Sequence, residues 1–207
     1  MPTRRRAPRL SRFFNRIGSH GWREGDYFTF SVRSPMLRCW IAAQLPEKTT
    51  RILSVGCGTG ELESHFSELR HHVIGLDYSR HMLKRARASG LKLLVQADSQ
   101  SLPFGGDSFD VVMFLESVGY LHLPTAFKEA KRVLGKHGRL LITTYSGNVE
   151  IHRAYAKLSL DEIALSLTVA GFRVKEHRFL NAKRSSLEEV PSDHGSTLLY
   201  ISSAKQR

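Results

Sequence analysis

From residue 51 onward, short runs of apolar residues alternate with longer stretches that mix apolar and polar positions. Short apolar runs bounded by turn residues are typical of buried strands, and the mixed stretches are typical of helices with one apolar face. The predicted strands are 51–55, 72–76, 91–96, 109–115, 139–144, 172–179 and 197–202. The predicted helices are 61–69, 80–89, 124–134 and 160–170.

Capping residues define the ends of three of these helices. Ser79 is a predicted N-cap, because its hydroxyl can accept a hydrogen bond from a free N–H of the first turn, and Gly90 ends that helix. Pro124 is expected at the first helical position, where its missing N–H has no consequence. Ser159 and Glu162 have the spacing of a capping box.

The alternation of strands and helices predicts an α/β fold with a doubly wound, mostly parallel sheet that is covered on both faces. Residues 181–196 are polar and contain no helix long enough for a crossover between the last two strands. Because parallel neighbours need such a crossover, the final strand is expected to be antiparallel. We expect a leader at 1–24 and a single domain at 25–207, with a motif-bearing core at 51–145.

The most informative segment is the turn Gly56-Cys57-Gly58-Thr59-Gly60, which follows the first predicted strand and opens the first helix. In open α/β sheets, ligands bind beyond the carboxyl ends of the strands. Glycines let the backbone approach a ligand closely, and the helix N-terminus adds N–H donors and partial positive charge. A tight turn without a ligand could use the same glycines, so the turn alone does not decide between the two.

Two aspartates at strand ends strengthen the ligand interpretation. Asp77 closes the second predicted strand, where a carboxylate can accept hydrogen bonds from both ribose hydroxyls. Asp98, followed by Ser99, closes the third, where a nucleobase edge would lie. Either aspartate alone could be a capping residue. A dinucleotide fingerprint has a third glycine at the position of Glu61, whose carboxylate would repel a pyrophosphate, so the sequence favours an adenosine ligand without one.

Composition limits the remaining function classes. The chain has 207 residues, of which 41% are hydrophobic, enough to close a core, and no apolar run is long enough for a transmembrane helix. Cys39 and Cys57 lack metal-site spacing, so neither a disulfide framework nor a zinc site is expected. The histidines show no ligand spacing, and we predict no metal. Reduced thiols fit a cytoplasmic protein.

The net charge of +12 is concentrated at the N-terminus, where residues 1–24 carry seven arginines and one acid. The apolar positions of this leader follow helical spacing and are Leu10, Phe13, Phe14 and Ile17. Four interpretations stay open. The leader could contact an anionic membrane surface or an RNA backbone, it could be an organelle transit peptide, or its apolar stripe could pack on the domain itself.

Four motifs, in the correct order, resemble those of the class I S-adenosylmethionine-dependent methyltransferases, and the nearest type is similar to the ubiquinone and menaquinone biosynthesis enzymes (the methyltransferase type 11 domain). The motifs are ILSVGCGTGEL, VIGLDYS, VQADSQSLPFGGDSFDVV and AFKEAKRVLGKHGRLLIT. The resemblance implies a Rossmann-like, seven-stranded sheet with an antiparallel last strand, and S-adenosyl-L-methionine as cofactor. The cofactor-binding residues that it implies are Gly56, Cys57, Gly58, Gly60, Asp77, Tyr78, Asp98, Ser99 and Glu116.

Methyl transfer is an in-line displacement at a sulfonium, so much of the catalysis can be positioning of the acceptor. A base is needed only when the acceptor starts protonated. The candidate catalytic residues at strand ends are Tyr120, His122 and Tyr145, and each could instead be a packing or surface residue. Relatives often carry a histidine at the position of Tyr120. Further candidates are His20, Trp22, Tyr27 and Phe28 for the acceptor, and Arg33 or Arg38 for the cofactor carboxylate.

The sequence therefore predicts a methyltransferase that acts on a small-molecule or lipid-like acceptor, in the cytoplasm or peripherally at a membrane. The alternative is a non-catalytic or RNA-directed S-adenosylmethionine-binding protein that docks on polyanions through residues 1–24. The intact glycine turn, Asp77 and Asp98 argue against a loss of catalysis. No Asn/Asp-Pro-Pro-Tyr motif follows the fourth predicted strand, which argues against methylation of base amino groups.

Overall fold

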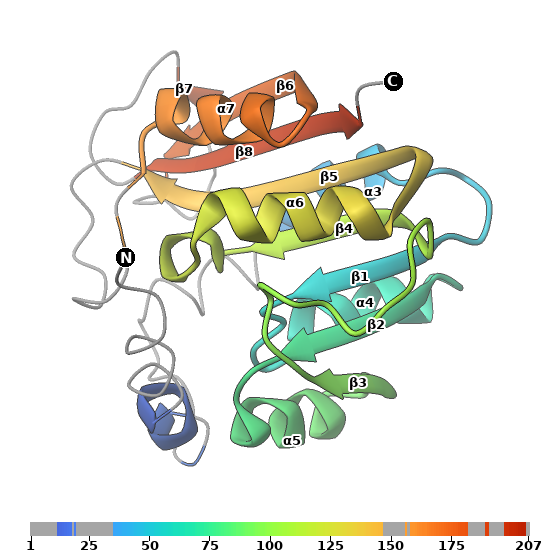
Figure 1. Ribbon diagram of the computed structural model, residues 1–207. Coiled ribbons are helices and arrows are strands. Elements are labelled where there is room, and N and C mark those ends of the chain that lie inside the picture. Colours follow the sequence, from blue (N-terminus) through green and yellow to red (C-terminus); the bar gives the residue numbers. More distant parts are fainter. Residues whose placement is uncertain are drawn as a thin grey trace.

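The structure is a computed structural model that describes residues 12–17, 19, 35–146, 156, 158–181, 189–190 and 197–205. These residues form one sheet with helices on both faces (Figure 1). The strands are β1 (Arg51–Val55), β2 (His72–Asp77), β3 (Leu93–Gln96), β4 (Phe109–Leu115), β5 (Leu134–Ser146), β6 (Phe172–Asn181), β7 (Glu189–Val190) and β8 (Thr197–Lys205). The helices are α3 (Pro35–Gln44), α4 (Glu61–Glu68), α5 (Arg80–Ala88), α6 (Leu123–Val133) and α7 (Leu160–Val169), with a 3-10 turn η1 (Val118–Tyr120).

The strand order is β3-β2-β1-β4-β5-β8-β6-β7. The five strands from β3 to β5 are all parallel to their neighbours, which confirms the predicted Rossmann-like α/β architecture. Strand β8 runs antiparallel to both β5 and β6. The described sheet has eight strands rather than the predicted seven, because β7, inside the segment predicted as a polar loop, pairs with the end of β6.

The core consists of two apolar layers, one on each face of the sheet. Ile52, Val111 and Met113 contribute to the layer beneath α3, α4 and α5. Val112 and Phe114, which point the opposite way, contribute to the layer beneath α6 and α7. Each fully buried side chain of this size stabilises the fold by about 1.5–3 kcal/mol, so the alternation along the central strands fixes the register of the sheet.

Local details show where the sequence patterns succeed and where they fail. The Ser79 hydroxyl accepts a hydrogen bond from the Met82 N–H at 3.2 Å, and the capping box of Ser159 and Glu162 is formed, so both predicted caps are confirmed. Helix α6 begins one residue earlier than predicted, which places Pro124 at its second position. Strand β5 is longer at both ends than the predicted 139–144.

Helix α3 was not predicted by the sequence patterns, although it buries Leu37 and Ile41 almost completely against the sheet. None of the described helices is both long and apolar enough to cross a bilayer.

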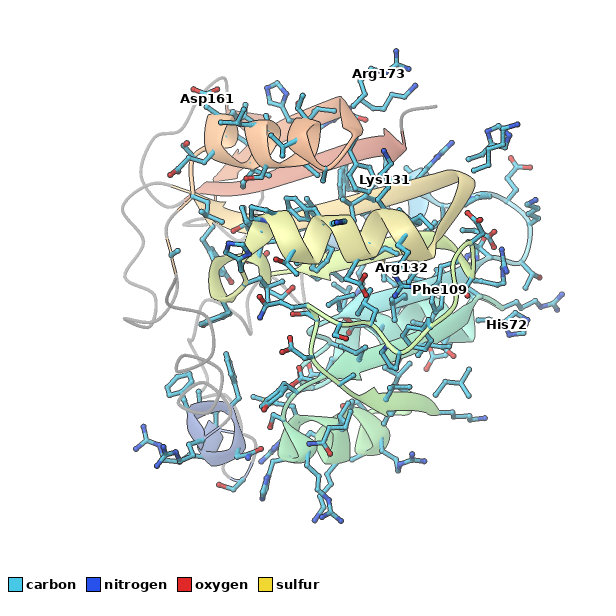
Figure 2. The ribbon with its side chains drawn as sticks, viewed as in Figure 1. His72, Phe109, Lys131, Arg132, Asp161 and Arg173 are labelled. Atoms are coloured by element: carbon cyan, nitrogen blue, oxygen red, sulfur yellow. The ribbon has the colours of Figure 1, made fainter. Side chains whose placement is uncertain are left out.

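The carboxyl ends of the parallel strands share one edge of the sheet. Figure 2 marks the opposite edge, where His72 and Phe109 begin β2 and β4. The helical residues 12–17 lie at the carboxyl edge, beside the start of α5 (Figure 1). The Ser79 hydroxyl donates a hydrogen bond to the Asn15 Oδ1 at 2.6 Å, which ties this N-terminal segment to the domain.

Candidate active site

The glycine turn closes over the end of β2. The backbone N–H groups of Gly56 and Cys57 both donate to the Leu76 carbonyl, at 2.7 and 3.0 Å. Gly60, with φ 68°, is the N-cap of α4. This left-handed conformation is strained for residues with a Cβ, so glycine at this position allows the chain to turn directly from strand into helix.

Gly56 lies against the loop that leaves β4. Its φ is +77°, and a Cβ built on it would be 2.7 Å from the Ser117 Cβ. Ser117 cannot easily move away, because its hydroxyl donates to the Val55 carbonyl at 2.8 Å. We therefore expect Gly56→Ala to lower the free energy of unfolding by roughly 1–3 kcal/mol, measured by urea denaturation.

Gly105→Ala is the matched control for that variant. A Cβ at Gly105 would be 3.6 Å from the nearest side-chain atom, the Ser108 Oγ, which is an ordinary contact. We expect it to change the free energy of unfolding by less than about 0.5 kcal/mol. Equal losses in the two variants would contradict the close packing inferred at Gly56.

The predicted ribose ligand Asp77 also organises the turn. Its Oδ2 accepts a hydrogen bond from the Gly58 N–H at 2.9 Å, and its Oδ1 accepts one from the Ser79 N–H at 2.7 Å. Burial raises the pKa of this carboxyl to about 6, while the N–H donors favour the charged form. A carboxylate oxygen has more than one lone pair, so Asp77 can hold the turn and still accept ribose hydroxyls.

The turn carries a buried polar group without a partner. The Thr59 hydroxyl is buried and makes no hydrogen bond within the described part of the chain. Buried hydroxyls are usually paired, so its position inside the glycine turn is consistent with a bound ligand. Cys57 is 3% exposed, and burial raises the pKa of its thiol, so this residue fits a structural role and not that of a nucleophile.

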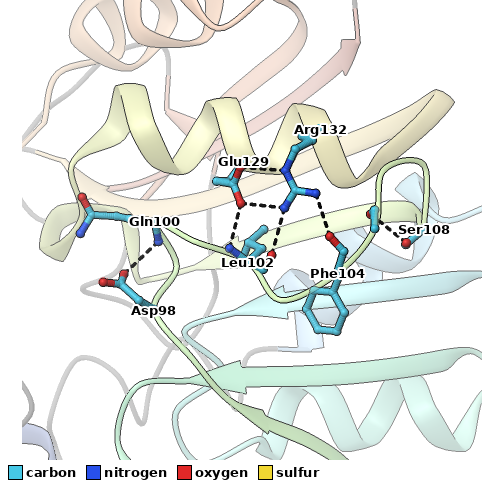
Figure 3. A network of polar contacts seen from close by, with 8 residues as sticks. Asp98, Gln100, Leu102, Phe104, Ser108, Glu129 and Arg132 are labelled. Carbon is cyan, nitrogen blue, oxygen red and sulfur yellow. Dashed lines mark hydrogen bonds and ion pairs between the residues drawn. The ribbon is translucent and has the colours of Figure 1, made fainter.

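The second predicted nucleoside contact, Asp98, begins an ordered loop between β3 and β4. Its Oδ1 accepts a hydrogen bond from the Gln100 N–H at 2.9 Å (Figure 3). Ser99, predicted beside the adenine, is half-buried. Tyr78 is 45% exposed, and its carbonyl accepts a hydrogen bond from the Gln96 side chain at 3.2 Å.

Helix α6 holds the far half of that loop. The Arg132 guanidinium donates to the carbonyls of Leu102 and Phe104, at 2.9 and 2.7 Å. Glu129 accepts hydrogen bonds from both the Leu102 N–H and Arg132, at 2.8 Å from the Leu102 nitrogen (Figure 3). Arg132 lowers the pKa of Glu129 through these contacts. The loop that positions Asp98 is therefore set by α6 as well as by the sheet.

Glu116 lies directly after β4 with φ 55°, a left-handed conformation that is uncommon outside glycine. Its N–H donates to the Thr143 carbonyl at 3.0 Å and to the Thr143 Oγ1 at 3.2 Å, which locks the backbone to β5. The side chain is 7% exposed. Burial raises the pKa of the carboxyl to about 8, and the nearby Thr143 hydroxyl acts in the opposite direction.

Tyr120 lies close to Glu116 and to the N-terminal segment. The Glu116 charge and burial both raise the pKa of its phenol, and burial has the larger effect. Its ring meets the ring of Phe14 edge-to-face, with centroids 4.9 Å apart. The sequence-based interpretation in which the apolar stripe packs on the domain is thus supported at Phe14, whereas Leu10 is outside the described residues.

The other predicted residues are placed as follows. His122 is exposed, and its Nδ1 is 2.8 Å from the Thr125 hydroxyl in the first turn of α6. Tyr145 is 5% exposed within the core layer that includes Leu37 and Ile41. Arg38 is half-buried on α3. His20, Trp22, Tyr27, Phe28 and Arg33 lie outside the described residues. Within those residues, no group of histidine, cysteine or acidic side chains could hold a metal ion.

Two site features were missed by sequence reasoning. Glu63 is 3% exposed on α4, and its Oε1 accepts a hydrogen bond from the Ser54 hydroxyl at 2.7 Å. A serine inside the apolar run of β1 is the only sequence signal for this pair. Asn15, which accepts a hydrogen bond from Ser79, is a single polar residue in the arginine-rich leader and belongs to no motif.

A protein family described as "Methyltransferase domain" matches residues 53–142, the segment that carries the glycine turn, Asp77, Asp98 and Glu116. This chain contains a methyltransferase domain. The cofactor implied for a methyltransferase domain is S-adenosylmethionine, and the residues present fit it. The turn contains the buried, partnerless Thr59 hydroxyl, and the Asp77 carboxylate contacts the same turn through the Gly58 N–H, so a polar ligand would find both an unused hydroxyl and a charged acceptor there.

Relatives extend the match beyond the family segment. The chain is 37% identical over 116 residues to YqeM of Bacillus subtilis, which is described as a methyltransferase (52% of this chain, 47% of the relative). It is 33% identical over 122 residues to the ubiquinone biosynthesis O-methyltransferase of Cereibacter sphaeroides (56% of this chain, 49% of the relative). The chain thus spans about half the length of these curated relatives.

A solved structure shares the fold of the whole described domain. The S-adenosylmethionine-dependent methyltransferase from Thermotoga maritima matches with a TM-score of 0.71, over 93% of this chain and 98% of that one, at 20% identity. The described part of this chain therefore has the same overall fold as that protein, with the glycine turn at the carboxyl edge of its parallel strands.

Proposed function

We propose that this protein transfers a methyl group from S-adenosylmethionine to a small-molecule or lipid-like acceptor. The observation that carries the proposal is the convergence of the glycine turn, Asp77 and Asp98 at the carboxyl ends of adjacent strands, inside a methyltransferase domain. The ubiquinone biosynthesis relative, named for a pathway with a lipid product, supports a lipid-like acceptor.

The roles of the residues follow from their positions. In this proposal the backbone of the turn faces the methionine part of the cofactor, Asp77 accepts hydrogen bonds from the ribose, and Asp98 with Ser99 borders the adenine. The bound cofactor supplies an electrophilic methyl group on sulfur. The chain's own contribution is to align an acceptor atom with that methyl group, which can account for several powers of ten in rate.

Calorimetric titration of the purified protein with S-adenosylmethionine, and separately with NADH, tests the proposal. We expect micromolar binding of S-adenosylmethionine and no binding of NADH, because Glu61 occupies the position where a dinucleotide site has its third glycine. Binding of NADH alone would overturn the assignment, and binding of neither would favour a non-catalytic protein.

We also propose that the basic N-terminus contacts an anionic membrane surface, which would bring a lipid-like acceptor to the site. Arg12 and Arg16 are exposed on the segment whose Phe14 and Asn15 contact the domain. Cationic side chains on the outer face and aromatic contacts on the inner face suit a segment between a domain and anionic lipids.

Two truncations separate these roles. Removing residues 1–11 is expected to weaken binding to anionic liposomes at least fivefold and to leave cofactor affinity unchanged, because the contacts of Phe14 and Asn15 remain. Removing residues 1–17 is expected to weaken both. Sedimentation with liposomes of mixed phosphatidylserine and phosphatidylcholine measures the first effect, and calorimetry measures the second. Unchanged liposome binding, or a loss of RNA binding instead, would contradict the membrane assignment.

A further inference from the structure

Both carboxylate oxygens of Glu116 are buried, and neither makes a hydrogen bond of acceptable geometry within the described part of the chain. The Thr143 hydroxyl, which accepts the Glu116 N–H, is near enough to lower the pKa of the carboxyl but does not reach its oxygens in that geometry. Carboxyl groups are seldom buried without partners, because removal from water is strongly unfavourable for the charged form and still unfavourable for the neutral one. Glu63, a second buried carboxyl, is paired with the Ser54 hydroxyl. The contrast leaves the Glu116 carboxyl available to a bound molecule.

The backbone directs this carboxyl and holds it in place. Glu116 adopts a left-handed φ of 55°, which non-glycine residues avoid because of Cβ contacts. The two hydrogen bonds from its N–H to Thr143, together with the bond from Ser117 to Val55, hold this strained turn against β5 and β1. Strain that is held from both sides is characteristic of functional positions.

Two aromatic side chains, Tyr120 and Phe14, lie on the side of the site where Glu116 is buried. Tyr120 lies near enough for the Glu116 charge to act on its phenol, and Phe14 packs edge-to-face on the Tyr120 ring. Aromatic faces attract cations through the ring quadrupole. A buried carboxylate near Tyr120, whose ring is itself packed by Phe14, is therefore complementary to an ammonium group, and it would repel an anionic acceptor.

We propose that Glu116, with the rings of Tyr120 and Phe14, forms the binding subsite for an amine acceptor whose nitrogen receives the methyl group. This inference rests on the proposed function, in which the glycine turn binds the methyl donor. Ser117, the next residue after Glu116, packs against Gly56, so Glu116 lies beside that turn.

The chemical step balances without any further reactant. The ammonium acceptor gives one proton to the Glu116 carboxylate, which becomes a neutral carboxyl and leaves a free nitrogen lone pair. The nitrogen lone pair becomes the new nitrogen–carbon bond as the carbon–sulfur bond breaks. The electron pair of the broken bond stays on sulfur, and the sulfonium becomes a neutral thioether. The methylated amine leaves as an ammonium ion. Burial raises the pKa of Glu116 to about 8, which brings its basicity close to that of an amine.

Three probes with the same aromatic ring test the subsite. Benzylamine, benzyl alcohol and phenylacetate differ only in whether the head group is cationic, neutral or anionic. We would measure their binding calorimetrically to full-length protein saturated with S-adenosylhomocysteine. Wild type is expected to bind benzylamine at least tenfold more tightly than benzyl alcohol and not to bind phenylacetate.

Variants assign the effect to the carboxyl. Glu116→Gln keeps the shape of the side chain and is expected to weaken benzylamine binding at least tenfold, with little effect on benzyl alcohol. Glu116→Asp keeps the charge and is expected to retain preference for the amine. Glu68→Gln, a matched change of an exposed acid on α4, is expected to have no effect. Saturation is set from the cofactor affinity measured for each variant.

Several outcomes would overturn the subsite. These are equal binding of the amine and the alcohol, no measurable binding of benzylamine, or equal benzylamine binding by wild type and Glu116→Gln. A wild-type protein that does not bind S-adenosylmethionine would instead refute the proposed function, and the two failures are thereby distinguishable.

Discussion

Replacement of Asp77 by alanine is expected to weaken the binding of S-adenosylmethionine by roughly 1–3 kcal/mol, or about 5- to 150-fold. Two interactions are lost in this variant. The ribose hydroxyls lose a charged acceptor, and the turn loses the bond between the Asp77 carboxylate and the Gly58 N–H. Calorimetry at pH 7.5 gives the affinity, and urea denaturation without cofactor shows how much of the loss comes from the turn itself.

The same carboxyl predicts a pH dependence of cofactor affinity. Asp77 has a pKa raised to about 6, chiefly by burial. Above pH 6 the ionised group can accept ribose hydroxyls, and below it a proton occupies the carboxyl. Affinity is therefore expected to fall as the pH drops from about 7 to 5 in the wild type, and this dependence should be reduced in Asp77→Ala.

Asp161→Ala is a suitable control, because Asp161 is an exposed acid on the outer side of α7 (Figure 2). It should leave both the affinity and its pH dependence unchanged. An Asp77→Ala protein that binds S-adenosylmethionine as tightly as the wild type would show that the ribose lies elsewhere.

The stability of the cofactor-free protein is expected to decrease as the pH rises from about 5 to 8.5. Burial raises the pKa of Glu63 to about 7 and that of Glu116 to about 8, from an ordinary value of 4.5. Over this range the folded chain retains protons that the unfolded chain has released, so the free energy of unfolding falls with pH. The stability is fully present below about pH 4.5, and each group can contribute a loss on the order of 3 kcal/mol.

Amide substitutions identify the groups responsible. Glu116→Gln cannot ionise, so its unfolding free energy in urea should depend less steeply on pH and should exceed that of the wild type at pH 8.5. Glu63→Gln should also flatten the dependence, while its amide oxygen can still accept the Ser54 hydroxyl. A wild-type stability that is constant or rises between pH 5 and 8.5 would contradict the burial of these two carboxyls in unpaired or weakly paired form.

The parallel half of the sheet could be predicted because its strands are continuous apolar runs bounded by glycine, aspartate or proline. The alternation of Val111, Val112 and Met113 between the two core layers requires exactly such runs. Helix α3 escaped prediction because it lies before the regular alternation begins. Strand β7 could not be predicted, because two residues are too few to show a periodic pattern. They are recognised as a strand only by their pairing with the end of β6.

The candidate site was predictable only in part. The residues of the glycine turn and Asp77 follow from spacing, because both sit at strand ends that the apolar runs locate. The second function of Asp77, as the acceptor of the Gly58 N–H, depends on the three-dimensional turn. The isolation of Glu116, its proximity to Tyr120 and the packing of Phe14 on the Tyr120 ring also required coordinates. More than a hundred residues of sequence separate Phe14 from that end of β4.

Strand β8 has a consequence for the order of events during synthesis. It lies between β5 and β6, which do not pair with each other, so both strands have an unpaired edge until β8 is in place. On the ribosome β8 emerges after every other strand of the described sheet. Until β8 has been synthesised, the exposed edges of β5 and β6 could pair with strands of neighbouring chains. Chaperones commonly protect such unpaired edges during folding.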